Sequence, residues 1–339
     1  MTMSETITKL TKKDFVSDQD IKWCPGCGDY SILNSVQKTF PDLGVAKEDF
    51  LVVSGIGCSS RFPYYMNTYG FHSIHGRAPA VASGAKLANP NLSVWLITGD
   101  GDAMSIGGNH FIHILRRNVD INILMFNNRI YGLTKGQYSP TSEVGKLTKS
   151  TPVGSLDYPF NPPSLALGAG ATFIARSIDK DIKHQGTIYK ESHEHKGSSF
   201  IEVYQNCNIF NDGAFSVLTD RETKLNNVIY LNHGEPMIFG FKDEPKGIIL
   251  DGFKLKVVNL SDYSESDLLV HDKYDKNLAM LICEMTYDDS LPTPYGVFYI
   301  ESKPTYEELF TEQINEQIES KGKGKLKDLI YTKNTWEVS

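Results

Sequence analysis

The stretch LITGDGD at residues 96–102 decides the predicted fold of this 339-residue chain. Its apolar half is typical of a buried strand, and the glycines and acidic residues that follow mark the turn at the end of that strand. Similar apolar runs recur at residues 50–56, 93–98, 121–126, 172–175 and 200–204. Helix-like patterns separate them at residues 30–40, 78–87, 107–117 and 163–169. Because buried strands that alternate with helices indicate βαβ units, we predict a doubly wound α/β fold around a mostly parallel sheet, with a C-terminal extension.

The ends of two of these strands predict a site for magnesium and a diphosphate. Asp100 follows one strand directly, and Asn128 follows the next strand 128 − 100 = 28 residues later, about one βα unit. The carboxyl ends of parallel strands meet at one edge of a sheet, where ligands bind. Mg²⁺ suits the oxygens of Asp100, Asn128 and the Ile130 carbonyl, and Gly99 and Gly101 let backbone N–H groups approach phosphate oxygens. Each piece alone is more simply a turn or a strand-end cap, but the pair at this spacing favours the metal site.

Four of the five cysteines predict a second site. Cys24 and Cys27 form a Cys-x-x-Cys in WCPGCG (23–28), whereas Cys58 and Cys207 each follow a strand. From chemistry alone, structural Zn²⁺, a redox dithiol and a [4Fe–4S] cluster all remain open. The dithiol leaves two cysteines unexplained, and zinc ribbons usually supply two close pairs. Cys283, in the strand-like run LICEM (281–285), is predicted to be a buried core residue.

The composition limits the classes of function. The formal net charge of −7, from 34 Lys and Arg against 41 Asp and Glu, argues against a nucleic-acid-binding surface. No run approaches the roughly 18 apolar residues of a membrane span, and the N-terminus lacks the apolar core of a secretory signal. We therefore expect a soluble, cytoplasmic protein without a membrane partner. In that compartment cysteines indicate metal or redox chemistry rather than disulfides.

Taken together, the motifs resemble one family. GDG followed by Asn-Asn at this spacing is similar to the cofactor signature of thiamine-diphosphate-dependent enzymes. WCPGCG, then GIGCS (55–59) before HGR (75–77), then GDGD, resemble the β subunit of 2-oxoacid:ferredoxin oxidoreductases over roughly residues 20 to 290.

This resemblance implies a thiamine-diphosphate-binding type of fold and a role for each motif. It implies Mg²⁺ on Asp100, Asn128 and Ile130, and a [4Fe–4S] cluster on Cys24, Cys27, Cys58 and Cys207. It also implies contacts with the cofactor from Ile56, Gly57, Cys58, Ser59, His75, Gly101, Asp102, Gly132, Leu133 and Thr134.

The resemblance further implies a reaction and its partners. The family oxidatively decarboxylates 2-oxoacids with coenzyme A as co-substrate and passes electrons through the cluster to ferredoxin, or runs in reverse. Its activating glutamate lies on the α subunit, and this chain has no convincing counterpart, so we expect activity only with the α subunit. A non-catalytic iron–sulfur electron carrier is the alternative from another class. The pair of Asp100 and Asn128 argues against it, because an electron carrier has no need of Mg²⁺.

Two residues bear on the substrate. Arg61 closely follows Cys58, and a cation there can pair with the distal carboxylate of 2-oxoglutarate, which pyruvate lacks. Leu133 resembles the 2-oxoglutarate branch, whereas pyruvate-specific relatives tend to have a polar residue there. We therefore predict conversion of 2-oxoglutarate to succinyl-CoA. A broad-specificity or pyruvate-type enzyme is the alternative. If Arg61 faces solvent or the α subunit, it does not favour 2-oxoglutarate over pyruvate.

The patterns divide the chain into four parts. Residues 1–22 form an N-terminal segment and residues 23–213 the domain for thiamine diphosphate and the cluster. Residues 214–290 lack clear βα alternation and form the family's C-terminal region, and residues 291–339 form a C-terminal tail.

Overall fold

The computed structural model describes residues 10–331, 336 and 338. Residues 1–9 of the predicted N-terminal segment and residues 332–335, 337 and 339 of the predicted tail lie outside the described residues. The strands are β1 (Phe50–Ser54), β2 (Tyr69–His72), β3 (Ser93–Gly99), β4 (Ile121–Asn127), β5 (Phe173–Ile178), β6 (Ser198–Tyr204), β7 (Val228–Leu231), β8 (Ile238–Phe241), β9 (Glu244–Asp251), β10 (Lys254–Asn259) and β11 (Thr293–Ile300). The helices are α1 (Asp29–Thr39), α2 (Phe62–Tyr65), α3 (Ala78–Ala88), α4 (Asp100–Met104), α5 (Gly108–Arg117), α6 (Pro162–Gly168), α7 (Ile182–Glu194), α8 (Ser216–Thr219), α9 (Lys224–Asn227), α10 (Lys276–Glu284), α11 (Tyr306–Lys321) and α12 (Leu326–Ile330). Within the described part of the chain, no helix combines the length and the apolar character that crossing a membrane requires.

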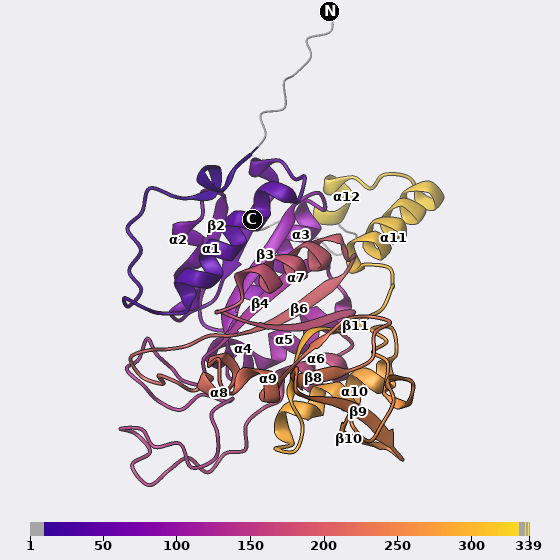
Figure 1. The fold of residues 1–339 in the computed structure, drawn as a ribbon. Helices are drawn as coiled ribbons and strands as arrows, with labels where there is room; N and C mark the ends of the chain where they lie inside the picture. Colours follow the sequence, from indigo (N-terminus) through magenta and orange to yellow (C-terminus); the bar gives the residue numbers. More distant parts are fainter. Residues whose placement is uncertain (1–9, 332–335, 337, 339) are drawn as a thin grey trace, which may run out of the picture.

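A central sheet of eight strands organises the chain (Figure 1). Its order is β2-β1-β3-β4-β6-β5-β11-β7, and every neighbouring pair is parallel except β5 with β11. The strands β4, β5 and β6 are buried along their whole length, as their continuous apolar runs predict. This architecture confirms the predicted α/β class with a mostly parallel sheet.

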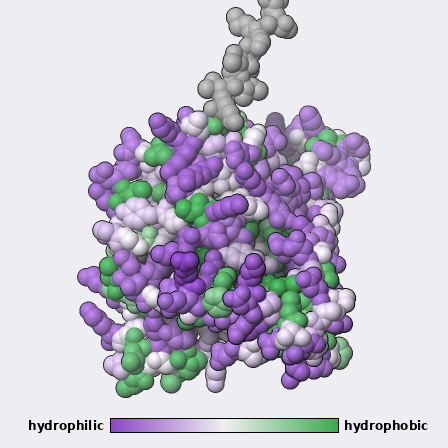
Figure 2. All heavy atoms as spheres, in the orientation of Figure 1, coloured by the Kyte–Doolittle hydropathy of each residue, from purple (hydrophilic) through white to green (hydrophobic). Residues whose placement is uncertain are grey.

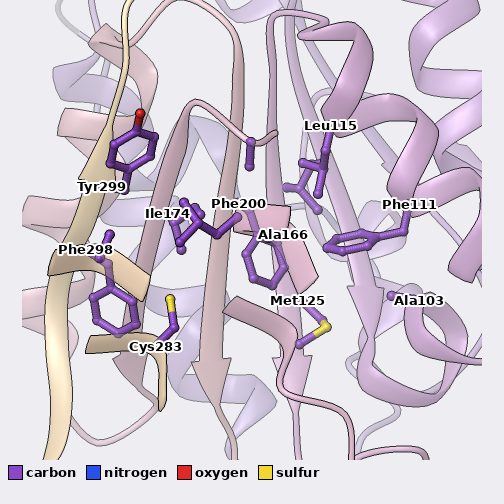
Figure 3. Close-up of a cluster of buried hydrophobic side chains, with 14 of the residues drawn as sticks. Ala103, Phe111, Leu115, Met125, Ala166, Ile174, Phe200, Cys283, Phe298 and Tyr299 are labelled. Carbon is purple, nitrogen blue, oxygen red and sulfur yellow. The ribbon is translucent and has the colours of Figure 1, made fainter. Parts of the chain in front are cut away.

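Helices cover both faces of the sheet (Figures 1 and 3). A separate apolar core lies between the sheet and the helices on each face. Successive side chains of a strand point to opposite faces. Leu96 therefore packs into the core shared with α3, α5, α6 and α10, whereas its neighbour Ile97 packs into the core shared with α1 and α7. Figure 3 shows Phe111 of α5 beside Phe200 of β6 in the first core. With both faces covered, the strand ends are the places left for a ligand.

The chain after residue 213 contributes to the same sheet. The strands β7 and β11 complete one side of it, with β11 antiparallel to β5 and parallel to β7. The sheet thus contains strands from both sides of the predicted division at residue 290. In addition, β8, β9 and β10 form a separate antiparallel sheet, at the lower right of Figure 1. The four-part division stays a prediction from sequence patterns.

Cys283 is buried as predicted, but its segment is a helix and the strand-like interpretation was wrong. The buried residues of α10 are Leu278, Ala279, Ile282 and Cys283, a spacing that places them on one helical face. Asp275 accepts hydrogen bonds from two backbone N–H groups of the first turn and caps the helix. A run of five residues is too short to distinguish the helical period from the strand period.

A buried ion pair lies in the middle of the sheet. Nε of Arg176 on β5 donates to Oε2 of Glu202 on β6 over 2.5 Å, and neither side chain is exposed. Asn127 at the end of β4 donates to Oε1 of the same carboxylate over 2.7 Å. Nη1 of Arg176 donates to Oγ1 of Thr286 over 2.6 Å. These hydrogen bonds compensate in part for the lost hydration of the charges, since Nη2 of Arg176 has no partner among the described residues, and they tie three neighbouring strands together.

We expect Glu202→Gln to lower the free energy of unfolding by about 3–5 kcal/mol, because it leaves the Arg176 cation buried without a counter-charge. Urea unfolding followed by circular dichroism measures the change. The control is Asp42→Asn, which breaks the exposed pair with Lys190 (2.7 Å) and should cost less than about 1 kcal/mol. Equal losses in the two variants would contradict the structural role of the buried pair.

Candidate functional site

The predicted site lies where neighbouring strands end. In the strand register Gly99 pairs with Phe126 and Asn127 pairs with Tyr204, so β3, β4 and β6 end at the same edge of the sheet. The residues that follow these ends lie side by side there: Asp100, Asn128 and Gln205. Asp100 also opens α4, so the predicted Gly-Asp-Gly turn is the first turn of a short helix.

A pocket opens at this edge. It brings together the predicted magnesium ligands and all the predicted cofactor contacts. Its lining consists of Ile56, Gly57, Cys58, Ser59, His75, Gly99, Asp100, Gly101, Asp102, Phe126, Asn128, Ile130, Tyr131, Gly132, Leu133 and Thr134. Four separate segments of the sequence thus line one space, while the role of each residue in it stays a prediction.

Asp100 is a buried carboxylate with hydroxyl partners on one oxygen. It is 2% exposed, and the hydroxyls of Ser139 and Thr141 donate to its Oδ2 over 2.5 and 2.6 Å. Burial raises the pKa of Asp100, and the two hydroxyls act against that rise. None of the ion pairs among the described residues includes Asp100. A buried carboxylate without a cationic side chain is suited to a bound metal ion.

Asn128 is held on both sides of its amide. Its Nδ2 donates to Oε1 of Gln205 over 2.8 Å, and its Oδ1 accepts from the backbone N–H of Ile130 over 3.2 Å. A carbonyl oxygen has two lone pairs, so one of them remains for a cation. The amide is therefore oriented with its oxygen usable and its nitrogen engaged.

Asp102 organises the loops on another side of the pocket. Its Oδ1 accepts from the backbone N–H groups of Ile56 (3.1 Å) and Gly76 (2.8 Å) and from Nδ1 of His75. Its Oδ2 accepts from Oγ1 of Thr98 over 2.8 Å. Protein donors thus use both oxygens of Asp102. With Nδ1 engaged by a carboxylate, Nε2 of His75 is the ring nitrogen available to a ligand.

The predicted cluster ligands line a second pocket. Cys24, Cys27, Cys58 and Cys207 all contribute to it. A Cβ placed on Gly132 would lie 3.5 Å from Sγ of Cys58 and 3.6 Å from Sγ of Cys207. The fold therefore gathers three distant parts of the sequence. Among the described residues, no three His, Cys, Asp or Glu side chains are placed as ligands of one metal ion, so the cysteine ligand set stays a prediction.

The thiols in this pocket differ in exposure and acidity. Cys24 is exposed, Cys207 is buried, and Cys27 and Cys58 are half-buried. Burial, reinforced by the nearby carboxylate of Asp29, raises the pKa of Cys58 to about 12 and the pKa of Cys27 well above its ordinary value. These two thiols stay protonated near neutral pH unless a cation binds them.

The two pockets share a wall. The residues common to both linings are Cys58, Asn128, Gly132 and Leu133. Cys58 therefore has a predicted role on each side of that wall, as the sequence analysis expects. A ligand in the first pocket and a metal centre in the second would lie on opposite sides of these few residues.

Of the two predicted substrate residues, Leu133 lines both pockets and Arg61 lines only the cysteine pocket. Nε of Arg61 donates to the hydroxyl of Tyr65 over 3.0 Å. Within the described part of the chain, no other side-chain hydrogen bond of Arg61 occurs, so its terminal amino groups are free for an anion. Leu133 is 51% exposed.

The sequence analysis missed three residues of this site. Tyr131 lines the first pocket, and its hydroxyl donates to the carbonyl of Gly101 over 2.9 Å. Ser139 and Thr141 contact Asp100 from the loop between β4 and α6. The only signal for the loop residues is the hydroxyl-rich run SPTS at 139–142, which without a fold is typical of any turn.

Comparison with known proteins gives three findings. The C-terminal thiamine pyrophosphate-binding domain of thiamine pyrophosphate enzymes matches residues 55–203. The 2-oxoglutarate oxidoreductase subunit KorB of Mycobacterium tuberculosis is 50% identical over 330 residues, which is 96% of this chain and 88% of that protein. The β subunit of 2-oxoacid:ferredoxin oxidoreductase 1 of Aeropyrum pernix is 49% identical over 190 residues, 56% of this chain and 60% of its own.

A solved structure is similar over nearly the whole chain. It is the 2-oxoglutarate:ferredoxin oxidoreductase from Magnetococcus marinus with 2-oxoglutarate, coenzyme A and succinyl-CoA bound. The TM-score is 0.76 at 32% sequence identity, and the alignment covers 96% of each chain.

We expect the metal-free thiols to react with a disulfide reagent in an order set by exposure and acidity. Exposed Cys24 reacts first near pH 7, whereas Cys58 reacts slowly because almost none of it is thiolate far below a pKa of about 12. The Cys58 rate should rise about tenfold per pH unit between pH 7 and 9. Mass spectrometry of quenched samples assigns each phase to a cysteine, and Cys58→Ser is the control that removes the phase assigned to Cys58. A Cys58 rate equal to that of Cys24 and independent of pH would contradict this picture.

Proposed function

The chain belongs to the β-subunit family of the 2-oxoacid:ferredoxin oxidoreductases, and on this premise we propose that it is the thiamine-diphosphate-binding half of a 2-oxoglutarate:ferredoxin oxidoreductase. The complete enzyme oxidatively decarboxylates 2-oxoglutarate, transfers the acyl group to coenzyme A as succinyl-CoA and passes electrons to ferredoxin, or runs the reverse reaction. Family membership agrees with the resemblance carried by WCPGCG, GIGCS and GDGD in the sequence.

The observation that carries this proposal is the wall shared by the two pockets. An enzyme of this kind needs electrons to leave the cofactor one at a time, which requires a redox centre close by. Cys58 lines the diphosphate pocket and also the cysteine pocket. An electron carrier or a zinc-stabilised binding module would need only one of the two pockets.

The first pocket fits magnesium and thiamine diphosphate. Asp100, Asn128 and the carbonyl of Ile130 are the proposed Mg²⁺ ligands, and the lack of an ion pair to Asp100 among the described residues supports a metal there. Gly101 gives the diphosphate a floor of backbone N–H groups at the first turn of α4. Thiamine diphosphate, when bound, supplies the carbanion chemistry at the keto carbon of the substrate.

The second pocket fits an iron–sulfur cluster. Its four cysteines stand on loops that the fold brings together, and the raised pKa of Cys58 and Cys27 indicates that thiolates form there only with a bound metal. Nε2 of Gln205 donates to Sγ of Cys27 over 3.3 Å. Hydrogen bonds of this kind to ligand sulfurs tune the potential of a cluster.

The remaining residues of the first pocket would bind and orient the cofactor. Asp102 holds His75 by its Nδ1, which directs Nε2 to the ligand. The same carboxylate fixes the N–H groups of Ile56 and Gly76, so one buried side chain determines the shape of two loops. Gly132, Leu133 and Thr134 close the pocket from the side that faces the cysteines.

The site is completed by a partner, which we propose to be the α subunit. No glutamate of the described residues lines the first pocket, although thiamine enzymes use one to activate the cofactor ring. Beside the pocket the loop between β4 and α6 exposes large apolar side chains, with Val153, Leu156 and Tyr158 each more than 80% exposed. Apolar atoms gather at this projecting loop at the lower left of Figure 2, which suits a covered surface.

Arg61 supports 2-oxoglutarate as the substrate. The guanidinium lines the cysteine pocket next to the shared wall, and Tyr65 holds it through Nε alone. Its terminal amino groups can donate two hydrogen bonds to the distal carboxylate.

We expect Asp100→Asn to raise the dissociation constant of thiamine diphosphate in the αβ complex by at least about 100-fold. Loss of a residue that only supports a metal ligand typically weakens metal binding by about 10–100-fold, and loss of the ligand itself should weaken it more. Titration calorimetry with Mg²⁺ present measures the dissociation constant. The control is Asp42→Asn, which breaks the exposed ion pair with Lys190 (2.7 Å) and lines neither pocket, and it should bind like the wild type. An Asp100→Asn complex with the same affinity and Mg²⁺ dependence as the wild type would refute the metal site.

We expect Arg61→Ala to lower kcat/KM for 2-oxoglutarate by about 10–100-fold and to leave kcat/KM for pyruvate nearly unchanged, since only the larger acid loses a charged hydrogen bond. Lys135→Ala, which removes another cation from the same pocket, is the matched control and should affect both acids alike. The substrate assignment fails if the wild-type complex prefers pyruvate, or if Arg61→Ala lowers both values equally.

A further inference from the structure

The loop between β4 and α6 returns to the carboxylate at the centre of the first pocket. Ser139 and Thr141 lie about 40 residues after Asp100 in the chain, and both donate to its Oδ2 over 2.5 and 2.6 Å. Both are buried, at 2% and 3% exposure. Ser142 fixes the loop by donating to the carbonyl of Arg129 over 2.6 Å and by accepting from the backbone N–H of Ser139 over 2.8 Å.

The hydroxyl of Thr141 also touches a buried chain of polar groups. It lies 2.9 Å from Oδ1 of Asn127, whose Nδ2 donates to Oε1 of Glu202. Glu202 is paired in turn with Arg176. The carboxylate of Glu202 can only accept hydrogen bonds, so the amide nitrogen of Asn127 must point toward Glu202. The amide oxygen of Asn127 therefore faces Thr141.

This arrangement fixes where the proton of Thr141 points. The hydroxyl has one hydrogen and two acceptors, the carboxylate of Asp100 at 2.6 Å and the amide oxygen of Asn127 at 2.9 Å. An ionised carboxylate is the stronger acceptor, and its contact is the shorter one. The hydroxyl of Thr141 therefore donates its hydrogen bond to Asp100. The rotation of the carboxylate is then set by two donors on the same oxygen, Oδ2.

We propose that Thr141 and Ser139 are positioning residues for the metal: they hold Oδ2 of Asp100 and thereby present its Oδ1 to the cation. This inference rests on the proposed role of Asp100 as a magnesium ligand and extends it to residues 139–142, a stretch of the loop that supplies none of the proposed ligands. It also explains why hydroxyl groups of a surface loop are buried against the strand ends. Without the two hydroxyls the buried carboxylate of Asp100 can turn between orientations. Part of the metal's binding energy is then lost in fixing that carboxylate.

The test uses the purified αβ complex with Mn²⁺ as the probe, counted as free ion by electron paramagnetic resonance in the presence of saturating thiamine diphosphate. We expect Thr141→Val, which keeps the shape and removes the hydroxyl, to raise the Mn²⁺ dissociation constant about 10-fold or more. Thr141→Ser restores the hydroxyl and should stay within about threefold of the wild type. Ser139→Ala should weaken Mn²⁺ binding in the same direction.

The matched control is Thr148→Val, the same change in the same loop, where the hydroxyl contacts Thr151 at 2.8 Å rather than Asp100. Its Mn²⁺ affinity should equal that of the wild type. In Thr141→Val, the Mn²⁺ concentration for half activation should rise, and kcat should recover at high Mn²⁺. The metal-free melting temperature of Thr141→Val should match that of Thr148→Val. A general loss of stability would lower the melting temperature instead.

The outcomes separate this inference from the proposed function. If wild-type complex binds Mn²⁺ as weakly as Asp100→Asn, the metal site itself is refuted. If the wild type binds tightly and Thr141→Val binds equally tightly, the positioning role is overturned and the metal site stands. Should Thr141→Val fail to fold, Ser139→Ala decides, and an unchanged Mn²⁺ affinity in that variant overturns the inference.

Discussion

The whole site depends on one buried carboxylate that no cationic side chain of the described residues neutralises. Asp100 lies at the end of β3, inside the protein, where an isolated negative charge is costly. Two hydroxyls occupy one of its oxygens and the neighbouring strand end supplies Asn128, so the surroundings hold the charge in place without cancelling it. A site built in this way gains stability when a cation binds, because the cation removes the cost of the buried charge.

A second constraint couples this carboxylate to the cysteines. The segment that carries Gly132 and Leu133 separates the two pockets. Cys58, which follows β1, lines both pockets at the same boundary. The loops around it are set by Asp102, which holds Ile56 and Gly76 by their N–H groups. A change in either loop would therefore move groups in both pockets. In the proposed enzyme this geometry would place the cofactor and the cluster a few residues apart.

Much of this arrangement follows from the sequence, and the reason is the regularity of parallel sheets. Asp100 and Asn128 could be paired from their spacing, because one βα unit places consecutive strand ends side by side. The choice of a [4Fe–4S] cluster for the four cysteines came from the resemblance to a family, since the chemistry of the residues alone left zinc and a redox dithiol open.

Other parts of the structure could not be predicted, because they depend on contacts between distant segments. Thr141 reaches Asp100 only after an irregular loop folds back, and no periodic pattern describes such a loop. The antiparallel strand β11 joins the sheet beside β5, more than 100 residues earlier in the chain, and its pairing was likewise not foreseen. Cys283 was assigned to the wrong element because a run of five residues, LICEM, is too short to distinguish a helix face from a strand.

We propose that a thiamine diphosphate site and a [4Fe–4S] cluster share a wall within this one chain. The most direct measurement is a crystal structure of the anaerobically purified αβ complex, with anomalous diffraction recorded on both sides of the iron absorption edge. The account predicts an iron peak in the pocket of Cys24, Cys27, Cys58 and Cys207 and diphosphate density at Asp100 across Gly132. A peak that appears only at the zinc edge, or a cysteine pocket without iron beside an occupied cofactor site, would contradict it.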